Sequence, residues 1–185
     1  MSNITTDHDL IIFDLNGTLV DPRIGAKNKP QFRAHAHDWR IKDGVFEPLR
    51  YLRANHVQLA IATNQGGVAF GITEPLDMQH AIMDAAYALG IYIVHFCFDH
   101  PDGSKPRWRH ESEYRKPAPG MLFRAMTDAH AIPERTLMVG DRDEDREAAL
   151  HAECQFMTAT DFFTALHKQM TQVPQSTVPE EDFPF

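Results

Sequence analysis

The chain is poor in cysteine, with only Cys97 and Cys154 among its 185 residues. The two do not form a close pair such as Cys-x-x-Cys, so no disulfide framework points to secretion. Residues 1–9 lack the basic start and apolar stretch of a signal peptide, and no apolar run approaches the roughly 20 residues that cross a bilayer. We therefore expect a cytoplasmic protein with no membrane partner.

Basic residues are scarce relative to acidic ones. The chain has 18 Lys and Arg against 26 Asp and Glu, a formal charge of -8. Nonspecific binding to nucleic acid or to an anionic membrane depends mainly on clustered Lys and Arg. The charge balance disfavours such a binder, although it leaves room for a local basic pocket.

The length and the 43% content of hydrophobic residues are those of one globular domain with a substantial core. We assign residues 1–170 to this domain. Residues 171–185 are polar and include Pro174 and Pro179, so we expect a disordered tail there. The sequence leaves the oligomeric state open.

Apolar runs and helical patterns alternate along the domain. Short β-rich runs predict buried strands at residues 10–13, 57–62, 91–98, 136–139 and 155–157. Helical patterns occupy residues 44–54, 74–89, 119–130 and 161–169, and a further helix begins after the strand at 136–139. Such alternation implies an α/β fold, a Rossmann-like three-layer α/β/α sandwich with a central parallel sheet. The gaps between elements are too short for a large cap domain.

Polar clusters lie at the ends of these strands or in loops beside them, at residues 14–18, 63–67, 115–117 and 141–145. In an open parallel sheet, ligands bind beyond the carboxyl ends of the strands. The coincidence predicts a single active site at that edge. Two segments without clear periodicity, residues 21–38 and 99–113, project from the same edge and are candidate substrate loops.

Two of the clusters are rich in carboxylates. Asp14 follows a strand and precedes Gly17, where a sharp turn is possible, so it can serve as nucleophile or metal ligand, although a turn-capping role is an ordinary alternative. Asp141 and Asp145 are four residues apart at a helix entrance. Such concentrated carboxylates repel one another unless a cation offsets them, and helix capping explains only one of them. Mg²⁺ favours this kind of site.

The other two clusters offer phosphate-binding groups. Thr63, Asn64 and Gln65 precede a glycine pair, so a hydroxyl, an amide and backbone N–H groups can receive phosphate oxygens, although a simple turn explains glycines too. Arg115 and Lys116 directly precede a helix. Lys116 can neutralise a phosphate as a compact point charge, and a solvated lysine is the ordinary alternative.

Taken in order, the four clusters resemble the four motifs of the haloacid dehalogenase (HAD) superfamily: Asp-x-Asp-Gly-Thr, a strand-end Thr, a Lys, and Gly-Asp-x-x-x-Asp. The Thr-Asn-Gln run at 63–65, Arg-Lys-Pro at 115–117 and Gly-Asp-Arg at 140–142 are similar to one branch of it. That branch contains histidinol-phosphate and heptose-bisphosphate phosphatases and the 3′-phosphatase domain of animal polynucleotide kinase-phosphatases. The resemblance covers residues 10–163.

The resemblance implies a catalytic role for each cluster. Asp14 would attack phosphorus in line and form an aspartyl-phosphate that water hydrolyses, while Thr63 and Lys116 hold the phosphoryl oxygens. The implied contacts to phosphate or substrate are Leu15, Asn64, Gln65 and Arg115. The implied Mg²⁺ ligands are Asp14, the backbone carbonyl of Asn16, and Asp141, with Asp145 supporting the metal shell or Lys116.

The expected function is thus that of a Mg²⁺-dependent phosphomonoester hydrolase. Its expected substrate is a phosphorylated small molecule, such as a sugar or metabolite phosphate. Two alternatives remain: a polynucleotide 3′-phosphatase, for which a nucleic-acid 3′ end is the substrate, and a noncatalytic phosphate-binding module.

One departure from the HAD pattern concerns proton transfer. Asn16 stands where the superfamily usually carries a second Asp as general acid and base. An amide cannot give a proton to a leaving alkoxide, and such catalysis contributes about 10²–10⁴-fold. Three explanations remain open: an engineered substitution that slows turnover, a natural enzyme with a good leaving group such as an anhydride, and a phosphate-binding protein without hydrolysis.

A second departure concerns zinc. Bacterial phosphatases of this branch carry Cys-x-His and, directly before Arg-Lys-Pro, Cys-x-Cys. The corresponding positions here are Cys97, Asp99, Ser112 and Tyr114. Structural zinc uses four nitrogen or sulfur ligands, so zinc is not expected even with His95, His100 and His110 nearby. The loop at 99–113 then needs other support, and we interpret Trp108 as its anchor to the core rather than as a nucleic-acid platform.

Overall fold

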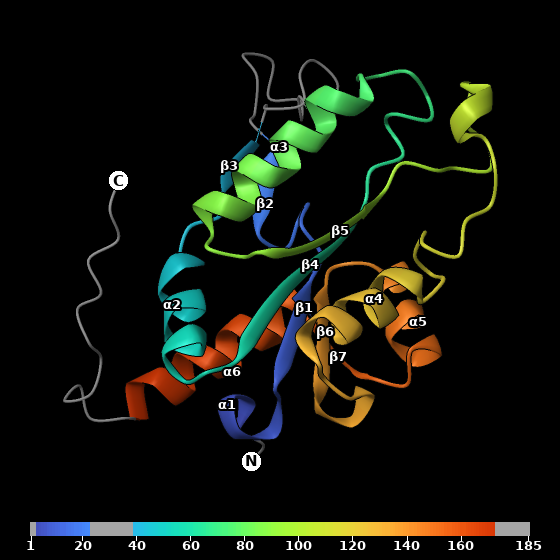
Figure 1. Cartoon of the computed structure of the whole chain (residues 1–185). Helices are drawn as coiled ribbons and strands as arrows, with labels where there is room; N and C mark the ends of the chain where they lie inside the picture. The colour runs from blue at the N-terminus through green and yellow to red at the C-terminus, as the bar shows by residue number, and fades with distance from the viewer. Residues whose placement is uncertain (1–2, 23–38, 173–185) are drawn as a thin grey trace.

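The computed structural model describes residues 3–22 and 39–172, and at its centre is a parallel sheet of five strands (Figure 1). The strands lie in the order β5-β4-β1-β6-β7, so the first strand of the chain is the middle one. Their bounds are β1 Leu10–Phe13, β4 Gln58–Asn64, β5 Ile93–Cys97, β6 Thr136–Gly140 and β7 Gln155–Thr158. Every predicted apolar run forms one of these strands, which confirms the parallel sheet.

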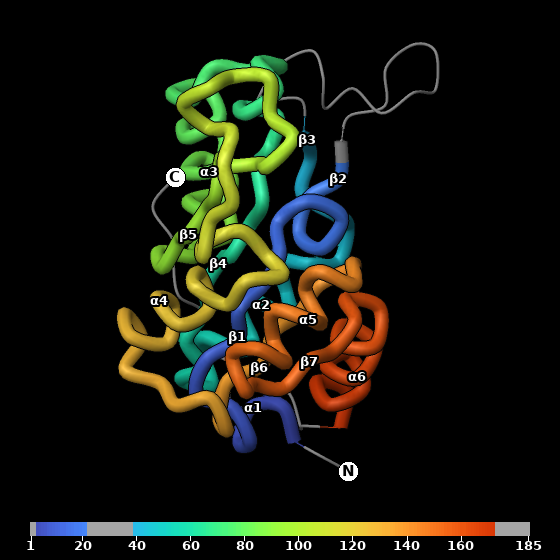
Figure 2. The backbone as a smooth tube through the Cα atoms, turned by 90° about the vertical axis from the view of Figure 1, so that its right-hand side faces the viewer, coloured from blue at the N-terminus to red at the C-terminus, as the bar shows by residue number. Residues whose placement is uncertain are grey.

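Helices cover both faces of the sheet. α4 and α5 pack on one face, and α2, α3 and α6 lie on the other (Figures 1 and 2). Their bounds are α2 Phe46–Ala54, α3 Pro75–Ala88, α4 Gly120–Ala129, α5 Asp143–His151 and α6 Ala159–Gln172. The shorter segments are α1 Ile4–Asp7, η1 Pro106–Trp108 and η2 Pro133–Arg135. The three-layer α/β sandwich is confirmed, and the described part of the chain contains no large cap domain.

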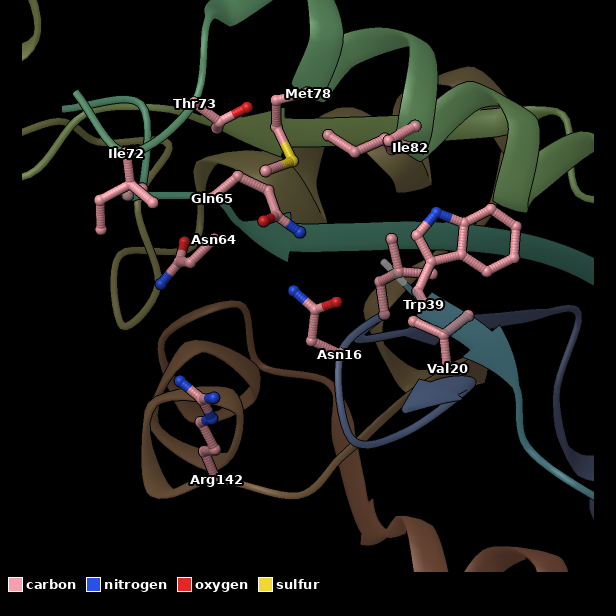
Figure 3. A pocket seen from close by; sticks show the side chains of 14 residues that line it. Asn16, Val20, Trp39, Asn64, Gln65, Ile72, Thr73, Met78, Ile82 and Arg142 are labelled. Atoms are coloured by element: carbon pink, nitrogen blue, oxygen red, sulfur yellow. The ribbon is translucent and has the colours of Figure 1, made fainter. Parts of the chain in front are cut away.

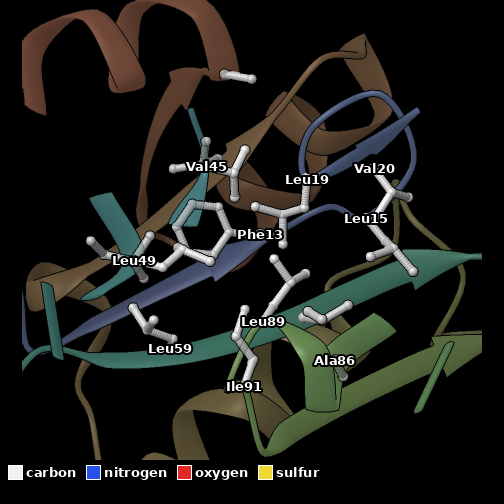
Figure 4. Packing of buried hydrophobic residues seen from close by; sticks show 14 of the residues in the cluster. Phe13, Leu15, Leu19, Val20, Val45, Leu49, Leu59, Ala86, Leu89 and Ile91 are labelled. Carbon is white, nitrogen blue, oxygen red and sulfur yellow. The ribbon is translucent and has the colours of Figure 1, made fainter. Parts of the chain in front are cut away.

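Successive side chains of β1 enter opposite layers, as strand geometry requires. Ile11 and Phe13 belong to the core beneath α2, α3 and α6, whereas Leu10 and Ile12 belong to the core beneath α4 and α5. Figure 4 shows Phe13 among residues of the first core. The ring of Phe162 from α6 meets Phe13 edge-on, with centroids 5.5 Å apart. Because both faces are covered, all four residues of β1 are buried, which explains its continuous apolar run.

Two short strands were not predicted. β2 Val20–Pro22 and β3 Trp39–Ile41 form an antiparallel pair beyond the carboxyl end of β1 (Figures 1 and 2). Three residues are too few for a strand to show an alternating pattern. The predicted loop at 21–38 therefore begins inside β2, and residues 23–38 lie outside the described residues. The second predicted loop, 99–113, is described throughout.

The last helix is longer than predicted, since α6 begins at Ala159 and ends at Gln172. The predicted tail at 171–185 thus starts within this helix, and from residue 173 onward it lies outside the described residues. No helix in the described ranges has both the length and the apolar composition needed to cross a membrane.

The edge-to-face contact of Phe162 and Phe13 predicts a large stability effect. Replacing Phe162, which is fully buried, with Ala should lower the free energy of unfolding by about 3–5 kcal/mol, because it leaves a cavity in the core. Phe123→Ala is the control, since Phe123 is 48% exposed, and it should cost about 0.5 kcal/mol or less. Urea unfolding measures both, and equal losses would contradict the assigned core.

Candidate functional site

A buried lysine joins the carboxyl ends of the central strands. The ammonium of Lys116 lies 2.6 Å from Asp14 Oδ1 and 2.6 Å from Asp145 Oδ1, and it donates to the carbonyl of Ala62 at 2.7 Å. Asp14 follows β1, Ala62 lies in β4, and Asp145 lies in α5. Burial disfavours the charged amine, but the two carboxylates outweigh this effect and raise the pKa of Lys116. Lys116 is therefore protonated at neutral pH.

Asp14 and Asp145 share this one ammonium, and the third carboxylate of the cluster, Asp141, lies 4.0 Å from the guanidinium of Arg142. Burial raises the pKa of Asp14, Lys116 opposes the shift, and the negative charges of Asp145 and Asp141 add to it. One oxygen from each of the three aspartates lies within 4.8 Å of the others. At Gly17, a Cβ atom would overlap Asp141 Oδ2, so only glycine lets Asp141 approach this closely. The excess negative charge and the oxygen donors fit a divalent cation such as Mg²⁺.

Asp145 shapes the turn that carries Asp141. Its Oδ2 accepts hydrogen bonds from the backbone N–H groups of Asp141 at 3.2 Å and of Arg142 at 3.1 Å. Its Oδ1 is buried and accepts no hydrogen bond of good geometry, although it forms the ion pair with Lys116. A Cβ atom at Gly140 would overlap the Asp145 side chain. Asp145 thus supports the turn and Lys116, while Asp141 is exposed and available to a ligand.

Two residues predicted to contact phosphate or substrate, Asn64 and Gln65, form hydrogen bonds within the protein. The side-chain amide of Asn64 donates to the Lys116 carbonyl at 2.9 Å and accepts from the Lys116 N–H at 3.1 Å. Gln65 is buried, and its amide donates to the hydroxyl of Thr63 at 3.2 Å. Asn64 therefore fixes the backbone of Lys116, a role that the sequence did not reveal because the two residues are 52 positions apart.

A cavity of about 250 Å³ is lined by chain neighbours of Asp14 and Asp141, namely Leu15 and Arg142, and by Asn16 (Figure 3). Its polar lining residues are Asn16, Asn64, Gln65, Thr73 and Arg142. Its larger apolar lining residues are Leu15, Val20, Trp39, Ile72, Met78 and Ile82. Asn16 and Leu15 were predicted as site residues, whereas the side chains from β2, β3 and α3 were not, because nothing in their local pattern marks them.

Arg115 lies at the side of the site. Its guanidinium donates to the carbonyl of Asp99 at 3.1 Å and lies next to Gly66, in the turn after β4. The structure thus brings Asp14, Thr63, Lys116 and the two later aspartates to one edge of the sheet, with Arg115 beside them. A direct contact of Arg115 with phosphate stays a prediction.

The loop at 99–113 is held by hydrogen bonds and aromatic packing. Asp99 accepts from the Cys97 thiol at 3.6 Å and pairs with His110 at 3.3 Å. The His100 N–H donates to the Trp108 carbonyl at 3.0 Å, and the indole of Trp108 packs edge-on against Phe98 at 5.5 Å. Trp108 therefore anchors the loop to the core, as predicted.

Several of the positions considered for zinc lie together, since Asp99 contacts both Cys97 and His110, and Ser112 lies beside the Cys97 thiol. Burial raises the pKa of the Cys97 thiol, which keeps it a hydrogen-bond donor to Asp99. His95 pairs with Asp128 of α4 at 3.1 Å, and Tyr114 is 46% exposed. Within residues 3–22 and 39–172, the one group of acidic, imidazole or thiol side chains close enough to share an ion is the aspartate cluster.

The aspartate geometry predicts a magnesium site that depends on Asp141. Asp141→Asn should weaken Mg²⁺ binding at least about tenfold, because a charged ligand is lost from a hard-cation site. Asp143→Asn is the control: Asp143 is exposed in the first turn of α5 and lies outside the cluster. Isothermal titration calorimetry measures the Mg²⁺ dissociation constant, which for the Asp143 variant should stay within about twofold of the value for the unmodified chain. Equal weakening of Mg²⁺ binding in the two variants would argue against this site.

Comparisons with known proteins identify the family. Residues 9–176 match the family model described as polynucleotide kinase 3 phosphatase. D-glycero-beta-D-manno-heptose-1,7-bisphosphate 7-phosphatase of Yersinia pestis is 37% identical over 141 residues, which cover 70% of this chain and 72% of that protein. The enzyme of the same name from Haemophilus influenzae is 32% identical over 149 residues, or 75% of this chain and 78% of the relative. The match to the Escherichia coli K12 enzyme spans 60% of each chain at 37% identity.

Solved structures agree with the fold. D,D-heptose 1,7-bisphosphate phosphatase from B. bronchiseptica, solved with magnesium and phosphate, has a TM-score of 0.65 at 22% identity and covers 91% of this chain and 90% of its own. A HAD-superfamily hydrolase from Ehrlichia chaffeensis has a TM-score of 0.61 at 16% identity, with coverages of 89% and 98%. With the sequence matches, these findings show that the chain is a HAD-superfamily phosphatase of the polynucleotide kinase 3 phosphatase family.

Proposed function

We propose that this phosphatase cleaves phosphate monoesters through Asp14. A carboxylate oxygen of Asp14 attacks phosphorus, the bond from phosphorus to the leaving alcohol oxygen breaks, and the phosphoryl group stays on Asp14. Water then attacks the same phosphorus, which frees phosphate and restores the carboxylate. The observation that carries the proposal is the contact of Asp14 with Lys116, at the sheet edge where Asp141 and Asp145 converge.

The neighbours of Asp14 have separate tasks. Lys116 holds Asp14 in place and can offer its charge to a phosphoryl oxygen, and Thr63 contributes a hydroxyl nearby. Mg²⁺, held by Asp14, Asp141 and the backbone carbonyl of Asn16, would neutralise charge on the phosphoryl group. We assign Arg115 to contact either the phosphate, on the side away from Asp14, or the leaving group.

Asn16 limits the rate in this proposal. Its side chain lines the cavity beside Asp14, where a leaving group would depart (Figure 3). The amide cannot protonate an alkoxide, so esters of ordinary alcohols should turn over slowly. Esters with acidic leaving groups need no such proton, so their turnover should be lowered less by the amide at position 16.

The substrate we propose is a sugar phosphate. Support comes from the relatives named as heptose-bisphosphate phosphatases, one of which matches over 72% of its length. A second candidate, a phosphorylated polynucleotide 3′ end, is favoured by the name of the matching family model. Against it stands Trp108, whose indole already packs on Phe98 and lies 4.9 Å from the guanidinium of Arg107, so part of its surface is used within the protein.

Restoring the carboxylate at position 16 tests the proposal. Asn16→Asp should raise the turnover of an alkyl phosphate by at least about tenfold, because it supplies the missing general acid and base. Turnover of p-nitrophenyl phosphate should rise less, since its leaving group is stable as the anion. Phosphate release with Mg²⁺ measures both rates.

The Asp14→Asn change in the same background is the control, and it should abolish release from this site. Equal rates for the unmodified chain and the Asn16→Asp protein on the alkyl ester would contradict the role given to position 16. No release from either protein would favour the noncatalytic phosphate-binding module. Strong preference for a 3′-phosphorylated oligonucleotide over sugar phosphates would favour the second candidate.

The contacts of Asn64 predict a positioning role. In the Asn16→Asp protein, Asn64→Ala should lower kcat about tenfold or more, because both backbone bonds to Lys116 are lost and the ammonium moves from its place. Asn55→Ala is the control, since the Asn55 amide donates to the Tyr51 carbonyl at the end of α2, away from the aspartates. If Asn64→Ala raised KM and left kcat unchanged, Asn64 would instead be a substrate contact.

A further inference from the structure

The cavity beside Asn16 has two chemically different sides. Trp39, Val20 and Ile82 lie on one side in Figure 3, and Asn64 and Arg142 lie on the other, with the apolar Ile72 above Asn64. Asn16 and Gln65 extend between the two sides. A ligand that fills this space meets hydrocarbon along one surface and hydrogen-bonding groups along the other.

The apolar side is built from elements outside the central sheet. Met78 and Ile82 are four residues apart in α3 and so share a face of that helix. Val20 belongs to β2 and Trp39 to the paired β3. Val20 and Ile82 are almost fully buried in the adjoining core and support this side from behind, whereas Trp39 and Met78 are only partly buried and offer the surface that a ligand can contact.

This apolar side of the cavity should discriminate between leaving groups of similar size. An open-chain polyol carries hydroxyls on every side, and those facing the wall would lose water without gaining a partner, which is costly. A sugar ring presents C–H bonds on a face and hydroxyls along its edge. The ring can therefore place its C–H face against Trp39 and Met78 while its hydroxyls reach Asn16 or Arg142.

We infer that this cavity holds the leaving group and selects cyclic sugar phosphates over open-chain polyol phosphates. The inference rests on the proposed function, because it assumes that ester cleavage occurs at Asp14. The inference assigns a specificity role to Trp39 and Met78, which would exclude water from the C–H face of the sugar ring.

Glucose 6-phosphate and sorbitol 6-phosphate form a matched pair of probes, because they have the same number of carbons and differ in the ring. In the Asn16→Asp protein, kcat/KM should be higher for the cyclic ester. Met78→Gln keeps the side-chain length and introduces an amide, and it should lower the value for glucose 6-phosphate by about tenfold. The value for sorbitol 6-phosphate should change by about twofold at most.

Met83→Gln is the matched control. Met83 lies in the same helix but is 44% exposed and does not line the cavity. It should leave both values unchanged. Equal losses for both esters in the Met78 variant, or no loss for either, would overturn the inference.

Fluorescence tests the same pocket without turnover. The chain has 2 tryptophans, so Trp108→Phe leaves Trp39 as the single indole, and adding Asp14→Asn prevents hydrolysis. With Mg²⁺ present, glucose 6-phosphate should shift the Trp39 emission saturably, whereas sorbitol 6-phosphate and inorganic phosphate should have little effect. An equal response to all three, or no response to any, counts against the inference.

The two proposals fail in different ways. Saturable ring binding at Trp39 without any Asp14-dependent phosphate release would support the cavity's selectivity and refute the hydrolase. Asp14-dependent release of phosphate from both esters, with no preference for the ring and no Trp39 response, would support the hydrolase and refute the selectivity.

Discussion

The buried ammonium of Lys116 is the interaction on which the site depends. It contacts a carboxylate after β1, a carbonyl of β4 and a carboxylate of α5, so one side chain joins three elements. A buried charge is tolerated only with such partners, and loss of one partner leaves the others uncompensated. The arrangement also leaves the aspartates with an excess of negative charge. The cluster therefore pairs part of its charge within the protein and keeps carboxylate oxygens that could hold a cation.

The sheet brings these groups together because its parallel strands direct their carboxyl ends to one edge. Ile12 of β1 pairs with Ala60 of β4 and with Met138 of β6. With that register, Asp14, the end of β4 and the turn after β6 all emerge at one edge. The apolar residues fix the register, and the register in turn places the polar ones. Packing on both faces of β1 thus helps to determine where Asp14 lies at the end of the strand.

The sequence predicted the strands and the polar clusters well, for a physical reason. Buried parallel strands need unbroken apolar runs, and parallel strands must direct their carboxyl ends to one edge. Local patterns contain no comparable signal for the hydrogen bonds between Asn64 and Lys116, which depend on how two distant segments meet. The same holds for the cavity wall, where Trp39 comes from a three-residue strand and Met78 looks like any core residue of a helix.

Position 16 shows how binding and turnover can be separated within one turn. Asn16 lies two residues after Asp14, and its side chain faces the cavity, whereas Lys116 holds Asp14 from the buried side. An amide at position 16 therefore leaves the charged cluster intact and removes only a proton-transfer group. It also spares an incoming phosphate the repulsion of one more carboxylate at close range. Under the proposed function, the amide that would slow cleavage should also make the site more tolerant of an anionic ligand.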